Sequence, residues 1–170
     1  MYSDKIVRNF LVKAFDYINN LYNGLFDDVK LEVTNEDYLQ SGYTYGFNEK
    51  THEIKNPRIT ICIEDYNEFD DFQTRHYNNE FGLNLEHKYL VVMLRILCHE
   101  MSHHINIEDF KDDDDEYYDC LHYIQEVYKS GTEERKRAYR MIPEEYAADQ
   151  NAAEILRYHL NDLLNLYEEN

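Results

Sequence analysis

Two histidines and a glutamate in the run His99-Glu100-Met101-Ser102-His103 have the types and the spacing that metal-assisted chemistry needs. In a helix, residues four apart lie on one face with their Cβ atoms about 6 Å apart. Two imidazole nitrogens at that spacing can both reach one zinc ion at about 2.0–2.1 Å. Glu100 points about a quarter-turn away, where it can contact a metal-bound water without being a ligand. The run therefore predicts a zinc site with a water-activating carboxylate.

The helix predicted around this run supports that interpretation. Apolar residues between 89 and 105 fall on more than one helical face, which indicates a central, buried helix. A chain of this composition would contain about 0.04 matches to the five-residue pattern by chance. The alternative is a pair of partly exposed histidines with a salt-bridging glutamate. His104 is a poor substitute for His103, because a five-residue step rotates it off the face of His99, and Cys98 is expected in the core.

A catalytic zinc ion needs a third protein ligand, with the fourth position left for water. The run Glu145-x-x-Ala148-Asp149 follows on a later predicted helix. Together, the two motifs resemble those of the gluzincin zinc metallopeptidases. The resemblance implies that Glu145 is the third ligand and that Asp149 hydrogen-bonds the imidazole of His99. Glu144 is the fallback ligand, but Ala148 stands four residues after it.

The later helix extends the similarity through Ala152 and Leu156 to the ImmA/IrrE-type peptidases, and minimal gluzincins fit as well. Those single-domain proteins have an N-terminal helix, a small sheet, the histidine-bearing helix and then the glutamate-bearing helix. Two departures stand out in this sequence. Asn151 lies where the family usually has an aromatic residue, and the interval from His103 to Glu145 is long.

A rival ligand set follows the metzincin pattern. Counting on from His99, the last ligand position of that pattern is Asp109, and its glycine position is Asn106. Asparagine can adopt the left-handed turn that the glycine would make. Met141 would then supply the methionine turn. Asp109 opens an acidic run over 108–119, however, and is as easily a loop residue.

Helices and a small sheet are expected to position these side chains. Apolar residues that recur every three or four positions predict helices at 3–23, at 116–129 and at 143–168, and a further helix that begins between residues 84 and 86 and ends near 105. Alternating patterns predict about three strands, at 29–33, 43–47 and 58–64. Residues 65–82 look polar and irregular, and the acidic run lacks the alternation of a calcium loop. We therefore expect one α+β, zincin-like domain over 1–170, with the N-terminal helix and sheet in 1–83 and the helices of the site in 84–170.

The predicted mechanism is hydrolysis of a peptide bond by a zinc-activated water. Glu100 acts as general base and then passes the proton to the leaving amine. The sequence offers Tyr139, Tyr146 and His122 as donors to the oxyanion. The strand at 58–64 is expected at the edge of the sheet beside the cleft, where it could pair with an extended protein or peptide substrate.

Charge and composition exclude several other classes. The chain has 17 basic and 35 acidic residues and a formal charge of −18, which argues against direct binding to nucleic acid or anionic lipid. No apolar run approaches the ~20 residues of a membrane helix. Three scattered cysteines favour a reducing cytoplasm. An acidic interaction protein, such as a DNA mimic, and a zinc-bearing regulator without proteolysis remain the alternative functions.

Overall fold

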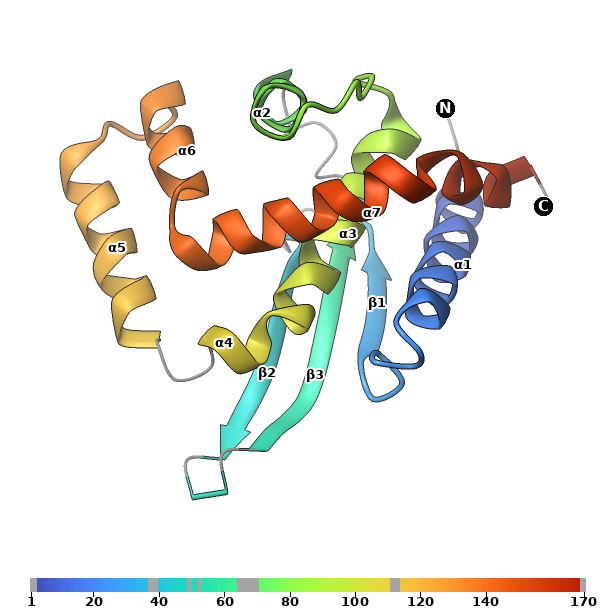
Figure 1. Cartoon of the computed structure of the whole chain (residues 1–170), viewed down its shortest axis with the longest axis horizontal. Helices are drawn as coiled ribbons and strands as arrows, with labels where there is room; N and C mark the ends of the chain where they lie inside the picture. The colour runs from blue at the N-terminus through green and yellow to red at the C-terminus, as the bar shows by residue number, and fades with distance from the viewer. Residues whose placement is uncertain are drawn as a thin grey trace.

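The computed structural model describes residues 3–36, 40–48, 50–51, 53–63, 71–110 and 114–168. These ranges hold seven helices and a three-stranded sheet (Figure 1). The strands are β1 (Lys30–Thr34), β2 (Gly42–Asn48) and β3 (Glu53–Cys62). The helices are α1 (Asp4–Leu21), α2 (Asp71–Phe81), α3 (Tyr89–Ile105), α4 (Ile107–Phe110), α5 (Asp114–Val127), α6 (Glu133–Arg140) and α7 (Pro143–Glu168). The architecture is mixed α+β and mostly helical, as the sequence predicts in outline.

The sheet is mixed, with strand order β1-β3-β2. β3 runs parallel to β1, with Leu31 opposite Ile59, and antiparallel to β2, with Tyr43 opposite Ile59. Among the described strands, β3 is therefore central and β2 is an edge. The expectation that the strand at 58–64 forms the edge is wrong, because residues 58–60 are paired with β1 on one side and with β2 on the other. Glu64 itself lies outside the described residues.

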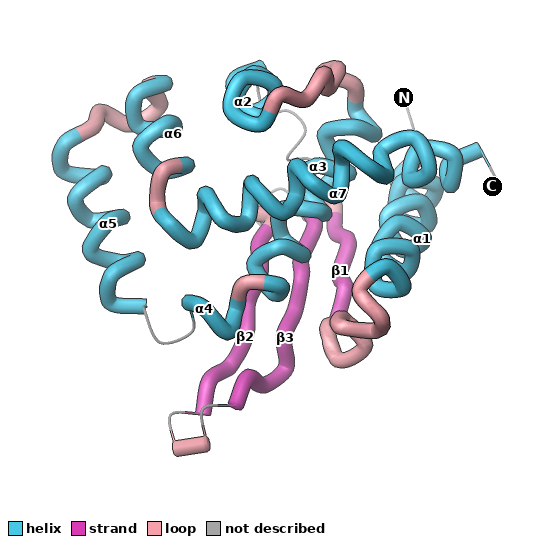
Figure 2. Tube along the Cα trace, in the orientation of Figure 1, coloured by secondary structure: helices cyan, strands magenta, loops and turns pink. Residues whose placement is uncertain are grey.

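Helix α3 is the central element of the fold. Its residues from Leu90 to His103 are all buried, and its most extensive helix packing is against α7, which crosses it (Figures 1 and 2). The apolar residues of α1, β1, β3, α3 and α7 belong to one core cluster. That core includes Ile59 and Leu156, so residues from 1–83 and from 84–170 pack into the same core. Because α3 lies at the centre of this core, the two histidines and the glutamate near its C-terminus are buried as well.

Local signals explain where the predicted helices begin and end. Gly24 has a φ of +83°, the left-handed conformation expected where α1 is followed by a turn. Pro143 is the first residue of α7, where its missing N–H leaves no helical bond unmade. Three helices were not predicted, among them the short α4 (Ile107–Phe110). Residues 71–81 form α2, although 65–82 looks irregular in sequence, and residues 133–140 form α6.

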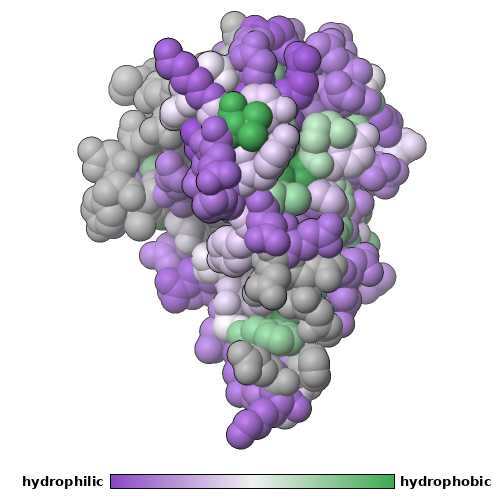
Figure 3. Space-filling view, turned by 90° about the vertical axis from the view of Figure 1, so that its left-hand side faces the viewer, coloured by the Kyte–Doolittle hydropathy of each residue, from purple (hydrophilic) through white to green (hydrophobic). Residues whose placement is uncertain are grey.

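Polar residues dominate the outer helices. The side of the molecule that carries α5 and α6 is mainly hydrophilic, and its apolar areas are small and separate (Figure 3). The described cysteines are not disulfide-bonded, and Cys98 is buried as expected. Within the described ranges, each helix is too short or too polar to span a lipid bilayer. Residues 111–113 of the acidic run lie outside the described residues.

Candidate metal centre

His99 and His103 lie one turn apart on the buried face of α3, as their spacing predicts. Their Nε2 atoms are 3.2 Å apart, and their rings meet edge to face. Only 5% of the surface of His99 is exposed. Two imidazoles held this way present adjacent nitrogen lone pairs in a site largely shielded from water.

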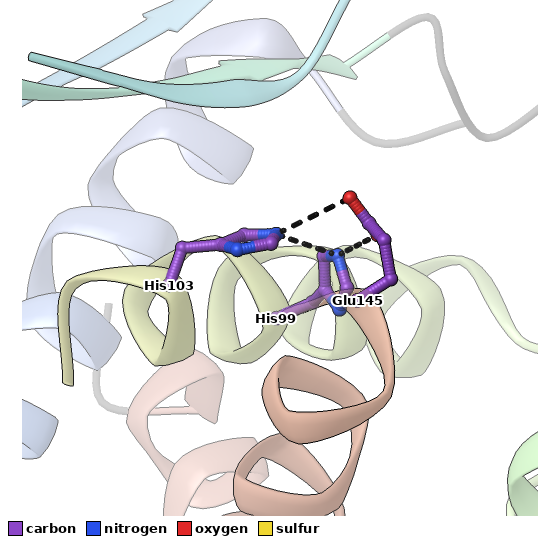
Figure 4. A group of neighbouring side chains, drawn as sticks. All are labelled: His99, His103 and Glu145. Carbon is purple, nitrogen blue, oxygen red and sulfur yellow. Dashed lines mark hydrogen bonds and ion pairs between the residues drawn. The ribbon is translucent and has the colours of Figure 1, made fainter. Parts of the chain in front are cut away.

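Glu145 reaches the histidine pair from a different helix. It lies in the first turn of α7, where the positive end of the helix dipole favours a carboxylate. Its Oε2 is 3.3 Å from His99 Nε2 and its Oε1 is 3.8 Å from His103 Nε2 (Figure 4). Residue 145, far along the chain from residues 99 and 103, is therefore brought to the imidazole pair by the crossing of α3 and α7.

The geometry of these three side chains fits a metal ion. One ligand atom from each lies within 4.8 Å of the others, and all three residues are buried. Ligands of a tetrahedral zinc ion at 2.0–2.1 Å lie about 3.3–3.4 Å from one another. The two histidine nitrogens are 3.2 Å apart, and Glu145 approaches them with different oxygens, Oε2 at 3.3 Å from His99 and Oε1 at 3.8 Å from His103. The group therefore offers two imidazole nitrogens and a carboxylate as possible ligands for one metal ion.

The rival ligand set is not assembled in this structure. Asp109 is exposed on α4 and lies outside the group that could hold a metal ion among the described residues. Asn106 has a φ of −92°, so it does not make the left-handed turn expected of the glycine position. Met141 is 57% exposed at the end of α6.

Asp149 fixes the orientation of His99. Its Oδ1 is 2.9 Å from His99 Nδ1, one helical turn beyond Glu145, in the arrangement that the gluzincin resemblance implies. Asp149 is fully buried and also accepts a hydrogen bond of 2.6 Å from the hydroxyl of Tyr77 on α2. His76 Nε2 lies 3.2 Å from its second oxygen. A proton held on Nδ1 by this carboxylate leaves Nε2 as the nitrogen that can bind a metal.

At the centre, neighbouring charges shift the pKa values of His99 and Glu145 in the direction opposite to the effect of burial. Burial lowers the pKa of His99, but the charge and hydrogen bond of Asp149 raise it, and the pKa lies at about 9. Burial raises the pKa of Glu145, but the hydrogen bond and charge of His99 and the charge of Arg140 bring it to about 2. The site is thus preorganised for a positive charge and keeps its carboxylate ionised.

Glu100 lies beside the three candidate ligands without being one of them. It is buried, and together with His99 and Glu145 it lines two cavities of about 410 and 260 Å³. Burial raises the pKa of its carboxyl, while the charges of the neighbouring histidines lower it, and the net shift is upward. A carboxylate in this position can accept a proton from water at the open coordination position.

Of the three oxyanion donors suggested by the sequence, the structure brings only Tyr139 to the centre. Its hydroxyl donates a hydrogen bond of 2.6 Å to Glu145, and the residue lines both cavities. The ring of Tyr146 packs against Phe81, and His122 is exposed beside Glu126 on α5. Burial and the charge of Glu145 raise the pKa of Tyr139, so its hydroxyl stays protonated.

Several residues of the centre were not predicted from the sequence. Arg140 Nη1 lies 3.3 Å from His99 Nε2 and donates at 3.4 Å to Glu145 and to Asp149. Tyr117 on α5 donates at 3.3 Å to Glu145 Oε1. These residues come from α5 and α6. For α6, the signal was present, because a capping Thr132 precedes two acidic residues and two arginines end the helix.

His104, the histidine that directly follows the motif, has a different environment. His104 lies 2.7 Å from the hydroxyl of Tyr43 on β2 and against the ring of Phe26. Burial lowers its pKa. It therefore joins α3 to the sheet, as expected from its rotation away from the face of His99.

No protein family, curated protein or solved structure matches this chain. The function of the chain is therefore inferred from the residues of the centre themselves.

Proposed function

We propose that this protein is a zinc-dependent peptidase of the gluzincin type. The observation that carries the proposal is the buried group of His99, His103 and Glu145, whose ligand atoms lie within 4.8 Å of one another beside a cavity that Glu100 also lines. The residue spacing within each of the two sequence motifs supports the same proposal. A structural cluster would not need a second carboxylate at the wall of the cavity.

The ligands and their partner would set the properties of the ion. Zinc in such a site lowers the pKa of a coordinated water to about 7 and stabilises negative charge on a carbonyl oxygen. His99 and His103 would bind the ion through Nε2, and Glu145 would bind it through its carboxylate. Asp149 holds His99 in the tautomer that this requires.

Glu100 moves the proton in this mechanism. It accepts a proton from the water as the water oxygen bonds to the peptide carbonyl carbon. It then delivers that proton to the amide nitrogen as the C–N bond breaks. The raised pKa of Glu100 suits both steps, because it brings the affinity of the carboxylate for a proton closer to neutral pH.

Tyr139 and β2 would handle the substrate. The protonated hydroxyl of Tyr139 donates to the carbonyl oxygen as negative charge develops on it. β2, one of the two edge strands of the described sheet, contributes Gly42, Tyr43 and Tyr45 to the smaller cavity. An extended peptide could pair with this strand, which takes the place that the sequence had assigned to the strand at 58–64.

The ligand assignment is tested by metal binding. The purified wild-type protein, stripped with a chelator and reloaded, should hold one equivalent of zinc by elemental analysis. E145Q should lose most of its zinc affinity, while D109N, which removes the same charge from the rival position, should keep it. Retention by E145Q and loss by D109N would transfer the third ligand to Asp109.

The catalytic assignment is tested separately. E100Q should keep its zinc and lose peptide hydrolysis, measured on a fluorogenic peptide library. If E100Q cleaves at the wild-type rate, Glu100 is not the base. A protein that holds zinc but cleaves nothing in either form would be a zinc-bearing regulator, and one that binds no zinc would favour the acidic interaction protein.

A further inference from the structure

The space around the candidate centre has two arms that differ in chemistry. His99, Glu100, Tyr139 and Glu145 line both of them. The smaller arm, of about 260 Å³, extends toward β2 and is rich in tyrosine. The larger arm, of about 410 Å³, extends toward α5 and α6. A peptide crossing the centre would place residues in each arm, on either side of the bond to be broken.

The larger arm has a basic wall in an acidic protein. Apart from Glu100 and Glu145, the charged residues that the structure describes in its lining are Arg135, Lys136 and Arg140. All three lie on α6, and the remaining polar lining consists mainly of glutamine side chains. The whole chain carries a formal charge of −18. Three basic residues on one cavity wall are therefore unexpected from its composition.

The three cations have different surroundings. Arg140 is buried and donates to Glu145 and Asp149, so it belongs to the centre. The Arg135 side chain has no carboxylate in ion-pair contact among the described residues, and it is only half-buried. Lys136 lies next to it with its Nζ 5.8 Å from the ring of Phe72. Arg135 and Lys136 are therefore the pair that faces the arm from outside the centre.

We infer that the larger arm is a subsite for a carboxylate of the substrate peptide, bound by Arg135 and Lys136. The inference rests on the proposed peptidase function and adds its substrate class, which is a peptide with an acidic group close to the scissile bond. A guanidinium and a neighbouring ammonium suit a carboxylate by charge and by hydrogen-bonding capacity. At physiological salt, interactions between charges more than about 8 Å apart are largely screened. A substrate group in the larger arm therefore interacts mainly with the nearby basic wall and only weakly with the distant acidic surface.

The carboxylate could come from an acidic side chain or from the end of a peptide, and matched substrates separate the two. One series of amidated peptides carries Glu, Gln or Lys at one position at a time. A second series ends in a free carboxylate or an amide. The zinc-loaded wild-type protein should cleave the carboxylate-bearing member of one series about tenfold faster in kcat/KM than its neutral analogue. Equal rates for Glu, Gln and Lys, and for both chain ends, would overturn the subsite.

Charge variants on α6 connect that preference to the two residues. R135Q/K136Q should remove the preference, and R135E/K136E should turn it toward Lys. R137Q is the matched control, since Arg137 is exposed on the same helix and lines a different groove. Circular dichroism confirms the fold of each variant, and the single substitutions R135Q and K136Q serve if the double variants are unstable. An unchanged preference in folded variants would contradict the assignment.

Binding to an inactive protein distinguishes failure of the subsite from failure of the peptidase. Calorimetry with zinc-loaded E100Q measures the affinity for the same peptides without cleavage. Charge-selective binding that R135Q/K136Q abolishes, in a wild-type protein that cleaves none of the peptides, would keep the subsite and reject the peptidase. Cleavage without charge selectivity in rate or affinity would keep the peptidase and reject the subsite.

Discussion

The hydroxyl of Tyr139 is the best-placed neutral donor of the candidate centre, and it can be removed without changing the shape of the ring. Y139F should lower kcat by about 10²-fold, because a lost oxyanion donor costs about that much, with little change in KM. Y146F, which alters a tyrosine packed against Phe81, is the control. Steady-state kinetics on a cleaved peptide measure both. Equal activity of Y139F and the wild type would show that Tyr139 serves only to hold Glu145.

His99 makes the stability of the metal-free protein depend on pH. Its pKa of about 9 is higher than the 6.5 of an unfolded histidine, so the folded state binds the proton more tightly. The stabilisation is complete below pH 6.5 and is lost as the pH rises through 9. Protonation of His99 contributes about 3 kcal/mol to the unfolding free energy of the metal-free protein. Urea unfolding of the chelated protein between pH 6 and pH 10 should show this loss.

The variant D149N isolates that contribution, because Asp149 is the main cause that raises the pKa of His99. Its unfolding free energy should change much less between pH 6.5 and 9 than that of the wild type. The same slope in both proteins would mean that another group controls stability in this range.

At the scale of elements, small residues on α7 let the two ligand-bearing helices approach. Ala148 and Ala152 are fully buried on the same face as Glu145 and Asp149, which meets α3. A152L should cost about 1–3 kcal/mol of unfolding free energy through overpacking. It should also weaken zinc binding, because Glu145 is held at its distance from the imidazole pair by this packing.

A147L is the matched control, since Ala147 is only half-buried on the same helix. Chemical denaturation and a competitive zinc chelator assay measure the two effects for both variants. A zinc affinity in A152L equal to that of A147L would show that the helix contact does not set the ligand distance.

The elements that could be predicted from the sequence are those with a local signal. The apolar residues of α3 and the Pro143 start of α7 fix those helices, and they carry all three candidate ligands. The polar helices α2 and α6 lack an apolar stripe, so they were missed, and the contacts of Tyr77 and Arg140 were missed with them. The position of β3 at the centre of the sheet was also missed, because strand order depends on pairing between distant segments.

At the scale of the whole molecule, the candidate ligands link segments far apart in the chain, so metal binding should stabilise the fold. A ligand that binds only the folded state raises the free energy of unfolding by about 2.7 kcal/mol when its free concentration is 100 times its Kd. Zinc should therefore raise the midpoint of thermal unfolding of the wild type. Above the Kd, the midpoint should keep rising with the logarithm of the zinc concentration. The candidate ligands that would produce this effect are His99, His103 and Glu145.

The net charge of −18 requires a further comparison, because any divalent cation screens repulsion within so acidic a protein. The shift in unfolding midpoint caused by calcium at the same concentration measures that general effect. The shift that zinc causes in E145Q measures the same effect for zinc in a protein that lacks one candidate ligand. The wild type should gain several degrees more from zinc than from calcium, while E145Q should gain similarly from both. Equal shifts with zinc and calcium in the wild type would mean that the acidic surface, not the buried centre, binds the ion.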